Sequence, residues 1–450
     1  MNIPFFHPKP VVRARPEHCI SRANIDPDAL KVLYRLSSAG YTAYLVGGSV
    51  RDLLLGRTPK DFDVGTDARP SDIRHIFRNC FLIGRRFRLA HIVFGKKVIE
   101  TSTFRRQPDN VPDEYAGMYQ QEDNTFGNPE EDANRRDFTI NGLFYDIQTF
   151  AIIDYVGGLK DLEKKIIRSI GDPNIRFQED PVRMMRAVKF ASRLHFEIER
   201  GTRKAIKKYH AEILKASVPR LCEEIFRLFA FRSARDAFKL MWEFGLLADL
   251  LPDLSRSIDE SGGNTSPHWR YLEALDADPA SGEASHAVCA ACLYYPLFKA
   301  AVADERRFGG RRISRPMAAR GVMRELAERL KVPRVTFFSA ANLFDCARRF
   351  LDPPDSQRGS RFLNQSDFAS ALQFQRVVLR AEGADDAMLR PWEAAWEKVK
   401  AGQWKGWTSD GTGEADEPFG GERPHRRRRR HRSRRFSRRR DTAEGAAENN

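Results

Sequence analysis

Two aspartates separated by one residue are the side chains of this sequence best suited to chemistry. Asp61 and Asp63 flank Phe62, and on a strand the two carboxylates would share one face while the phenyl ring turns to the core. Such a pair can hold two Mg²⁺ ions about 3.5–4 Å apart, which stabilise the attacking and leaving oxygens of phosphoryl transfer. Mg²⁺ also prefers carboxylate, water and phosphate oxygens. A lone Asp-x-Asp is usually a solvated strand edge or a turn, so the surrounding sequence has to decide.

A strand, a tight turn and a helix are predicted upstream of these aspartates. The apolar run at residues 44–46 ends at Gly47 and Gly48, and an apolar-periodic segment follows. Glycines let a backbone approach phosphates closely, and the free N–H groups of a helix start favour anions. Arg51, one turn into the helix, can add charge against a triphosphate. Asp52 is better suited to orienting Arg51 or capping backbone groups than to binding a metal.

Two further blocks follow in order. Residues 135–141 read Arg-Arg-Asp-Phe-Thr-Ile-Asn, and residues 179–190 begin Glu-Asp-Pro-Val-Arg. With the first block they resemble the three motifs of class II nucleotidyltransferases, the family of bacterial poly(A) polymerases and of enzymes that add CCA to tRNA. The resemblance covers about residues 20–255, with weaker similarity to about 400. It implies an α+β fold, with an N-terminal nucleotidyltransferase head built on a polymerase β-like mixed sheet, followed by all-α neck, body and tail-proximal domains.

The same resemblance assigns roles to individual residues. It makes Asp61, Asp63 and Asp137 catalytic, with Mg²⁺ on the first two and ATP as the substrate. The nucleotide-binding residues that it implies are Gly47, Gly48, Arg51, Arg136, Asn141, Glu179, Asp180, Arg183 and Arg186. Within the family, the residues matching Asp180 and Arg183 read the incoming base, and the residue matching Arg186 approaches the phosphates. Glu100, in an apolar strand, is a rival for the third carboxylate, and a plain strand-edge charge is the alternative.

Local geometry supports some of these roles. If the segment from Asp137 is helical, Asn141 lies one turn on, within reach of a ribose hydroxyl. In the third block Asp180 is a suitable N-cap, and Pro181 suits the first turn of a helix. Arg183 and the arginine one turn later would then share a face beside an apolar stripe. An ordinary amphipathic helix with surface arginines is the alternative reading of that block.

The choice of product depends on resemblance alone. Residues 81–95 and 126–134 resemble the poly(A) group more than the CCA-adding group, although no physical reason follows from Arg85, Arg86 or His91. We therefore predict a polynucleotide adenylyltransferase that adds AMP to RNA 3′ ends without a template. A tRNA CCA-adding enzyme is the nearer alternative. A catalytically inert RNA-binding protein is the more distant one, and the occupied acidic positions argue against it.

Charge agrees with a polyanionic partner. The 450 residues carry a formal charge of +15, and residues 421–450 alone hold twelve arginines against four acids. Like charges at that density cannot form a core, so residues 409–450 are expected to be a disordered tail. Its predicted RNA contacts, which would be salt-sensitive, are Arg426, Arg427, Arg428, Arg429 and Arg430. A solvated solubility tail or contact with an anionic membrane is the alternative.

The remaining segments complete the expected organisation. We predict an irregular leader at 1–24, a head at 25–172 with a helix at 25–40 and a long loop at 107–134, a helical neck at 173–255 and a helical C-terminal domain at 256–408. The basic patch at 306–315 is either a second RNA contact or a solvated loop. Cys289 and Cys292 are read as buried helix thiols rather than metal ligands. The apolar run at 287–298 is too short for a membrane helix, no signal peptide is evident, and a cytoplasmic protein with RNA-decay partners is expected.

Overall fold

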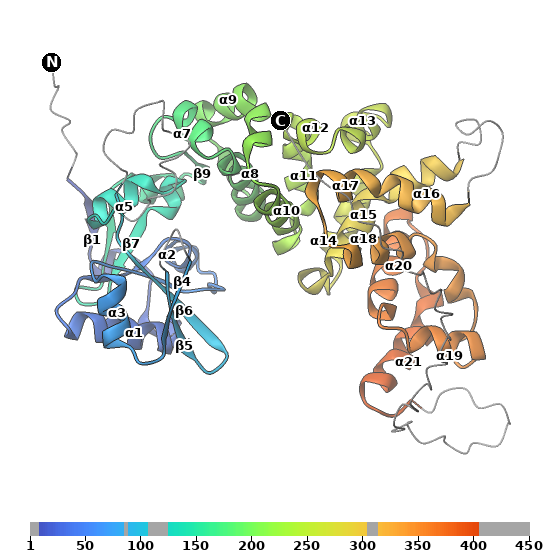
Figure 1. Ribbon diagram of the computed structural model, residues 1–450, viewed down its shortest axis with the longest axis horizontal. Helices are drawn as coiled ribbons and strands as arrows, with labels where there is room; N and C mark the ends of the chain where they lie inside the picture. Colours follow the sequence, from blue (N-terminus) through green and yellow to red (C-terminus); the bar gives the residue numbers. More distant parts are fainter. Residues whose placement is uncertain (1–8, 85–88, 107–124, 304–313, 405–450) are drawn as a thin grey trace, which may run out of the picture. The chain divides into compact units, whose positions relative to one another are not determined.

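The computed structural model describes residues 9–84, 89–106, 125–303 and 314–404 (Figure 1). They belong to one unit of the chain, which ends at Trp404. The predictions for the arginine-rich tail, for Arg85 and Arg86, and for most of the basic patch lie outside the described residues. Within the patch, Arg315 is described, and its Nε donates to the Asp345 carboxylate over 2.6 Å.

A mixed sheet of eight strands forms the N-terminal part, as predicted, in the order β1-β8-β7-β2-β3-β6-β5-β4. The strands are β1 (Val11–Arg13), β2 (Ala43–Val46), β3 (Asp63–Thr66), β4 (Cys80–Ile83), β5 (Leu89–Phe94), β6 (Lys97–Thr103), β7 (Leu143–Asp146) and β8 (Ala151–Asp154). Among the described strands of this sheet, only β3 and β6 pair in parallel. The irregular leader needs correction, because β1 pairs with β8 at the edge of the sheet.

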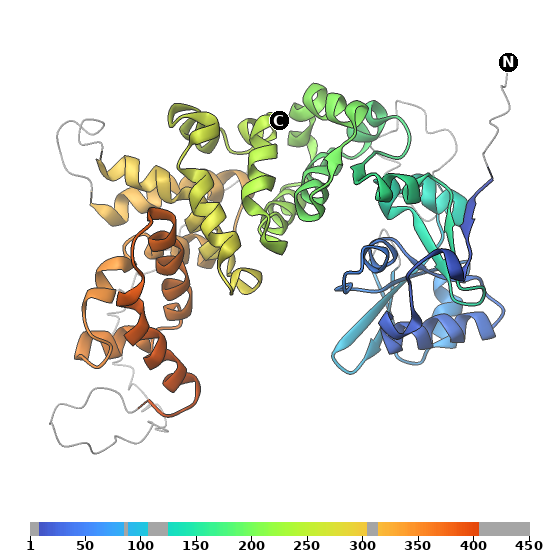
Figure 2. The ribbon, with the colours of Figure 1, turned by 180° about the vertical axis from the view of Figure 1, so that it is seen from behind.

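One face of the sheet is covered by α1 (Pro27–Ser38) and α3 (Pro70–Ile76) (Figures 1 and 2). The predicted start of α1 is confirmed, since the Asp26 carboxylate accepts from two backbone N–H groups of its first turn. Apolar residues at helical spacing on α1 then bury against alternate residues of the strands, such as Leu45 and Val64. This packing fixes which side chains of each strand must face the other way.

Of the residues that the structure describes, only a few cover the opposite face of the sheet. Over β7, β2 and β3 lies a second apolar cluster of Val46, Phe104, Ala133 and Phe144, to which α5 (Pro129–Arg135) contributes. The helix α5 is a departure from the end of the long loop predicted for 107–134, of which residues 107–124 lie outside the described ranges. Asn128 caps it and Pro129 begins it, and both are residues that favour a helix start.

Helices follow the sheet, as predicted from residue 173 onward. The head itself contains α2 (Gly48–Leu54) and α6 (Gly158–Glu163). After the head come α7 (Pro173–Glu179), α8 (Val182–Leu194), α9 (Arg200–Tyr209), α10 (Val218–Arg227), α11 (Ala234–Glu243), α12 (Leu246–Leu250) and α13 (Pro252–Glu260). A small parallel pair, β9 (Ile166–Ile167) and β10 (Glu197–Ile198), joins the head to α8. Of this set, α8 carries the third sequence motif and packs on α10 and α11.

The C-terminal helices are α14 (His268–Ala277), α15 (His286–Ala303), α16 (Arg315–Val322), α17 (Arg324–Leu330), α18 (Arg334–Leu343), α19 (Gln357–Leu363), α20 (Phe368–Glu382) and α21 (Arg390–Lys400). Cys289 and Cys292 are buried in α15, as predicted. This helix extends beyond the expected run at 287–298, and its length and apolar composition would suffice to cross a membrane. It nevertheless packs against α14, α16, α18 and α20 (Figure 1), as the core helix of a globular domain does.

Candidate active site

Asp63 is the first residue of the central strand β3 and lies at the junction of the glycine turn and the sheet. Val46, the last residue of β2, pairs with Asp63, so Gly47 follows directly beside it. Asp61 is exposed and precedes the strand, which corrects the prediction that both aspartates share a strand. Phe62 between them is half-buried and packs against the main core. The two carboxylates are therefore held at the entry to one strand.

Glu100 is the strand neighbour of Asp63. Val64 pairs in parallel with Thr101, and the same register one residue earlier sets Asp63 beside Glu100 on one face. Burial and the charges of Glu100 and Asp61 raise the pKa of Asp63 to about 6, although Arg136 lowers it. A carboxylate with so much negative charge around it is stabilised by any cation that binds there.

The predicted strand, turn and helix are present as β2, Gly47 and α2. Gly47 has φ +69°, and a Cβ there would lie 2.8 Å from Arg136 Nη1. Both the left-handed backbone and this close approach require glycine. Arg136 donates to the Asp132 carboxylate at 3.1 and 2.9 Å and to the carbonyl of Asn141. The guanidinium is thus fixed beside the turn, and the turn is left free of side-chain bulk.

Arg51 is turned into the protein rather than toward solvent, with 2% of its surface exposed. Its Nε donates to Asp52 at 2.8 Å, and its Nη1 donates to the side-chain oxygen of Asn141 at 2.5 Å. The prediction that Asp52 orients Arg51 is confirmed. Asp52 also accepts from Arg193 of α8 at 2.8 Å, a bond that ties the glycine-turn helix α2 to the third-motif helix.

Asp137 is buried and bonded on every side. It accepts from the Phe138 backbone, from the Asn141 side chain and from Arg186 Nε at 2.7 Å. Burial alone would raise the pKa of Asp137, but Arg186 and these hydrogen bonds hold it well below its usual range. The segment is not helical as expected: α5 ends at Arg135, and a single 3₁₀ turn covers Thr139–Asn141.

The base-reading residues expected in the third motif lie where α7 meets α8. The N-cap of α8 is Pro181 rather than Asp180, which instead ends α7. Asp180 accepts from Arg220 of α10 at 2.9 Å, and its other oxygen is buried without a partner in the described part of the chain. Arg183 donates to Glu179 at 3.3 Å. Because Arg183 is bonded to Glu179 of α7 and Arg186 to Asp137, these are not the freely solvated arginines of the alternative reading.

A buried charge cluster anchors α8 to α10. Glu224 accepts from Lys189 at 2.6 Å and from Arg227 at 3.0 Å, and Arg186 lies 3.9 Å away. Burial and the nearby Arg186 charge lower the pKa of Lys189 to about 8, against the pull of Glu224. Sequence reasoning missed Glu224, Arg193 and Arg220, because their partners lie far away in the chain.

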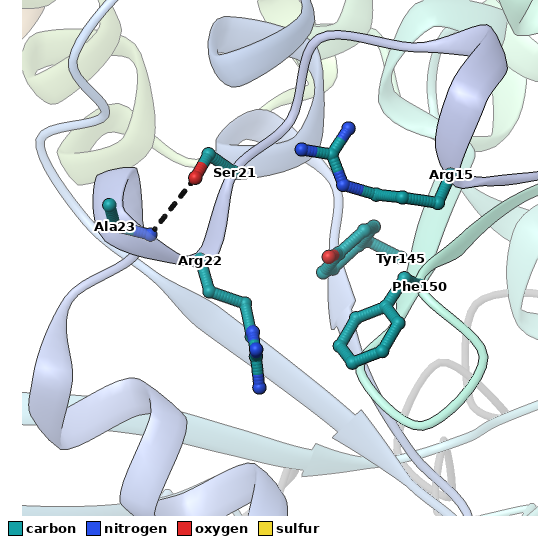
Figure 3. A pocket seen from close by; sticks show the side chains of 6 residues that line it. All are labelled: Arg15, Ser21, Arg22, Ala23, Tyr145 and Phe150. Atoms are coloured by element: carbon teal, nitrogen blue, oxygen red, sulfur yellow. Dashed lines mark hydrogen bonds between the residues drawn. The ribbon is translucent and has the colours of Figure 1, made fainter.

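A separate hollow on the head carries none of the predicted site residues. Its lining includes Arg15 and Arg22 beside the rings of Tyr145 and Phe150 (Figure 3). The Arg22 guanidinium lies 4.8 Å from the centre of the Phe150 ring. The chemistry-bearing residues gather instead around β3, and across the described ranges no group of three or more His, Cys, Asp or Glu side chains forms a metal cage.

Two family profiles match the chain in these same regions. Residues 43–168 match "Poly A polymerase head domain", and residues 195–258 match "Probable RNA and SrmB- binding site of polymerase A". Poly(A) polymerase I of Escherichia coli is 38% identical over 402 residues, which cover 85% of this chain and 84% of that protein. The chain belongs to the poly(A) polymerase family. The family predicted from the three motifs is thereby confirmed.

The CCA-adding enzymes are also relatives, but over less of the chain. The CCA-adding enzyme of Lactobacillus helveticus is 40% identical over 236 residues, which cover 50% of this chain and 55% of that protein. Among solved structures, the CCA-adding enzyme of Bacillus stearothermophilus in complex with CTP has a TM-score of 0.60 at 28% identity, and covers 84% of this chain and 83% of its own. The predicted α+β fold with a transferase head and helical C-terminal domains is confirmed.

Proposed function

We propose that this protein adds AMP from ATP to the 3′ ends of RNA without a template. The observation that carries this proposal is the extent of similarity to poly(A) polymerase I, which spans 85% of the chain. Similarity to a CCA-adding enzyme at nearly the same identity spans only 50%. The sequence match to poly(A) polymerase I therefore covers more of the chain than the sequence match to that CCA-adding enzyme.

Asp61 and Asp63 would hold Mg²⁺ in this proposal. Their oxygens are the ligands that Mg²⁺ prefers, and a small protein ligand set suits an ion that keeps waters and binds substrate phosphates. The raised pKa of Asp63, about 6, supports this fit because a cation would offset the surrounding negative charge. The metal would supply Lewis-acid stabilisation of the phosphate oxygens. That Asp137 is the third acidic residue of the site stays a prediction. The position of Glu100 beside Asp63 supports Glu100 as the alternative for that role.

The chain's own residues would position the reactants. Gly47 leaves room for the triphosphate, and Arg136, fixed beside that turn, would neutralise the charge on the departing pyrophosphate. The RNA 3′-hydroxyl would lose its proton to solvent and attack the α-phosphorus, the new P–O bond would form, and the bond to the departing pyrophosphate would break. Asp180 and Arg183 would read the adenine edge. Catalysis would come mainly from orientation and charge stabilisation.

Two wider expectations belong to the same proposal. Residues 195–258, which match the RNA- and SrmB-binding profile, would contact RNA, and the arginines at 426–430 would add sequence-independent affinity. We also propose a cytoplasmic location and an association with RNA-decay partners.

Purified full-length protein tests the proposal when it is offered RNA with ATP alone or with CTP plus ATP. We expect long ATP-only tails with the wild-type protein and no AMP incorporation by Asp61→Ala or Asp63→Ala, with RNA binding retained. The variant Glu328→Gln, which alters an exposed carboxylate of α17 outside residues 195–258, serves as the control. Addition of a fixed CCA trinucleotide to tRNA, or tailing by the Asp61→Ala/Asp63→Ala double variant, would overturn it.

A further inference from the structure

Four side chains form a row across the sheet face that carries Asp63. The register sets Asp63 beside Glu100, Glu100 pairs with His91 of β5, and His91 pairs with Phe81 of β4. Cross-strand partners point to the same side of a sheet. The row therefore runs from the acidic site to the edge strand without changing face.

The alternation of burial along the strands confirms this orientation. Cys80 and Leu82 of β4 pack toward the main core, whereas Phe81 between them is 62% exposed. The same applies to β6, where Ile99 is buried and Val98 on the row's face is 41% exposed. The second apolar cluster, which covers β7, β2 and β3 on this face, includes no residue of β4 or β5.

The geometry of phosphoryl transfer indicates which reactant would lie over β6, β5 and β4. Gly47 and Arg136 lie on the β2 side of Asp63, where the proposed function puts the pyrophosphate. In phosphoryl transfer the attacking and leaving oxygens are roughly in line on opposite sides of the phosphorus. The 3′-hydroxyl of the RNA must then arrive from the β6–β5–β4 side.

The spacing suits a nucleoside. Neighbouring strands lie about 4.8 Å apart, so Phe81 is roughly 10 Å from Glu100 across the sheet. That separation is comparable to the span between a ribose 3′-hydroxyl and the far edge of its base. His91 occupies the middle of this span, with Nε2 at 3.7 Å from the Glu100 carboxylate.

We propose that Phe81, with His91 between it and Glu100, is the platform on which the 3′-terminal base of the RNA stacks. The proposal rests on the proposed function and identifies the site of its second substrate. Every base has a π-face, so stacking on an aromatic ring tolerates any terminal nucleotide. Such tolerance lets one site accept both the nucleotide that ends the starting RNA and the adenosine that ends it after each addition. It also gives Phe81 and His91, two residues of the stretch that resembles the poly(A) group, a physical role.

An RNA oligonucleotide with 2-aminopurine as its 3′-terminal base tests the platform directly. Without ATP no addition occurs, and stacking of the terminal base quenches its fluorescence. We expect quenching by the wild-type full-length protein, its loss with Phe81→Ala, and its retention with Phe81→Trp. The same oligonucleotide with an internal 2-aminopurine should respond equally to all three proteins.

Steady-state kinetics provide the second readout. Loss of one base–aromatic stack should raise KM for RNA between about 5-fold and about 150-fold in Phe81→Ala, with KM for ATP unchanged. Val12→Ala, which removes another exposed apolar side chain (56% exposed) from the opposite edge strand β1, should leave both values unchanged.

Unchanged quenching and unchanged KM for RNA in Phe81→Ala would overturn the platform while wild-type tailing kept the proposed function intact. Absence of AMP addition by the wild-type protein would instead remove the proposed function itself. A change confined to the sedimentation mass of Phe81→Ala would mean that the face binds a second copy of the chain, and this too would overturn the platform.

Discussion

Ionised Asp63 destabilises the folded head when no metal is bound. Replacing Asp63 with an uncharged residue should therefore make the metal-free head more stable. Burial, Glu100 and Asp61 raise its pKa from the ordinary 3.8 to about 6. A carboxyl group whose pKa is raised by folding binds its proton more tightly in the folded state. Ionisation of Asp63 therefore opposes folding wherever the pH exceeds the pKa of Asp63 in the unfolded chain.

The magnitude follows from the size of that shift. Each pKa unit corresponds to about 1.36 kcal/mol, so a rise of roughly two units costs about 3 kcal/mol when Asp63 is fully ionised. The cost is absent below pH 3.8, grows as the pH rises, and is complete above about pH 6. Asp63→Asn, which cannot ionise, should stabilise the head by about 3 kcal/mol at pH 8 and by about half as much at pH 5.

Hydrogen exchange measured by mass spectrometry is the suitable assay, because all six tryptophans lie beyond residue 241 and fluorescence does not report on the head. The free energy of opening for peptides spanning β3 would be compared between wild type and Asp63→Asn in EDTA. Glu197→Gln makes the same kind of change at an exposed carboxylate of β10 and should alter that free energy by less than about 0.5 kcal/mol. Added Mg²⁺ should stabilise the wild-type head but not the variant.

The result that refutes this reasoning is simple to recognise. If Asp63→Asn lowers the opening free energy at pH 8, or leaves it unchanged, then Asp63 is not the destabilised carboxylate inferred from its neighbours. If the variant is stabilised equally at pH 5 and pH 8, its effect comes from packing or hydrogen bonding rather than from charge.

Two further predictions concern α8 and its partners. Arg220→Ala removes the ion pair with Asp180, which is 2.9 Å long and largely exposed on the arginine side, so stability should change by less than about 1 kcal/mol. The ratio of kcat/KM for ATP to kcat/KM for CTP should nevertheless fall several-fold, and Arg220→Lys should restore part of it. An unchanged ratio would count against a role in base reading. Arg186→Met leaves the Asp137 charge buried without its partner and should lower the opening free energy of the head by about 3 kcal/mol, measured by hydrogen exchange. Asp137→Asn added to Arg186→Met should recover much of that loss, and no recovery would show that the pair's charge does not matter.

Local patterns predicted what local physics determines. The cap at Asp26, the glycine turn at 47 and the start of the helices after residue 173 all depend on residues within a few positions of one another. The same holds for the orientation of Arg51 by its neighbour Asp52. The three motifs carried the family, since their order along the chain is itself a sequence property.

These local patterns do not predict which segments pair when they are far apart in the chain. The leader strand β1 joins β8 across more than a hundred residues, and three residues are too few to show a period. The expected helix after Asp137 fails because Phe138 pairs with Ser169 as extended backbone and the Asp137 carboxylate is bonded to Arg186, and these tertiary contacts outweigh local propensity. The rivalry between Asp137 and Glu100 could be examined only once the β3–β6 register was known.

The way α8 is held explains how a base could be read without a template. Arg193 joins α8 to Asp52 in the glycine-turn helix, and Arg186 joins it to Asp137 in the head. On its other side, Lys189 joins it to Glu224 of α10. Buried ion pairs contribute little net stability, but breaking one is costly, so they fix α8 in a single position between the head and α10. An enzyme with no template strand has only its own side chains to define the shape of the base it accepts, and these three anchors hold the helix that begins directly after Asp180.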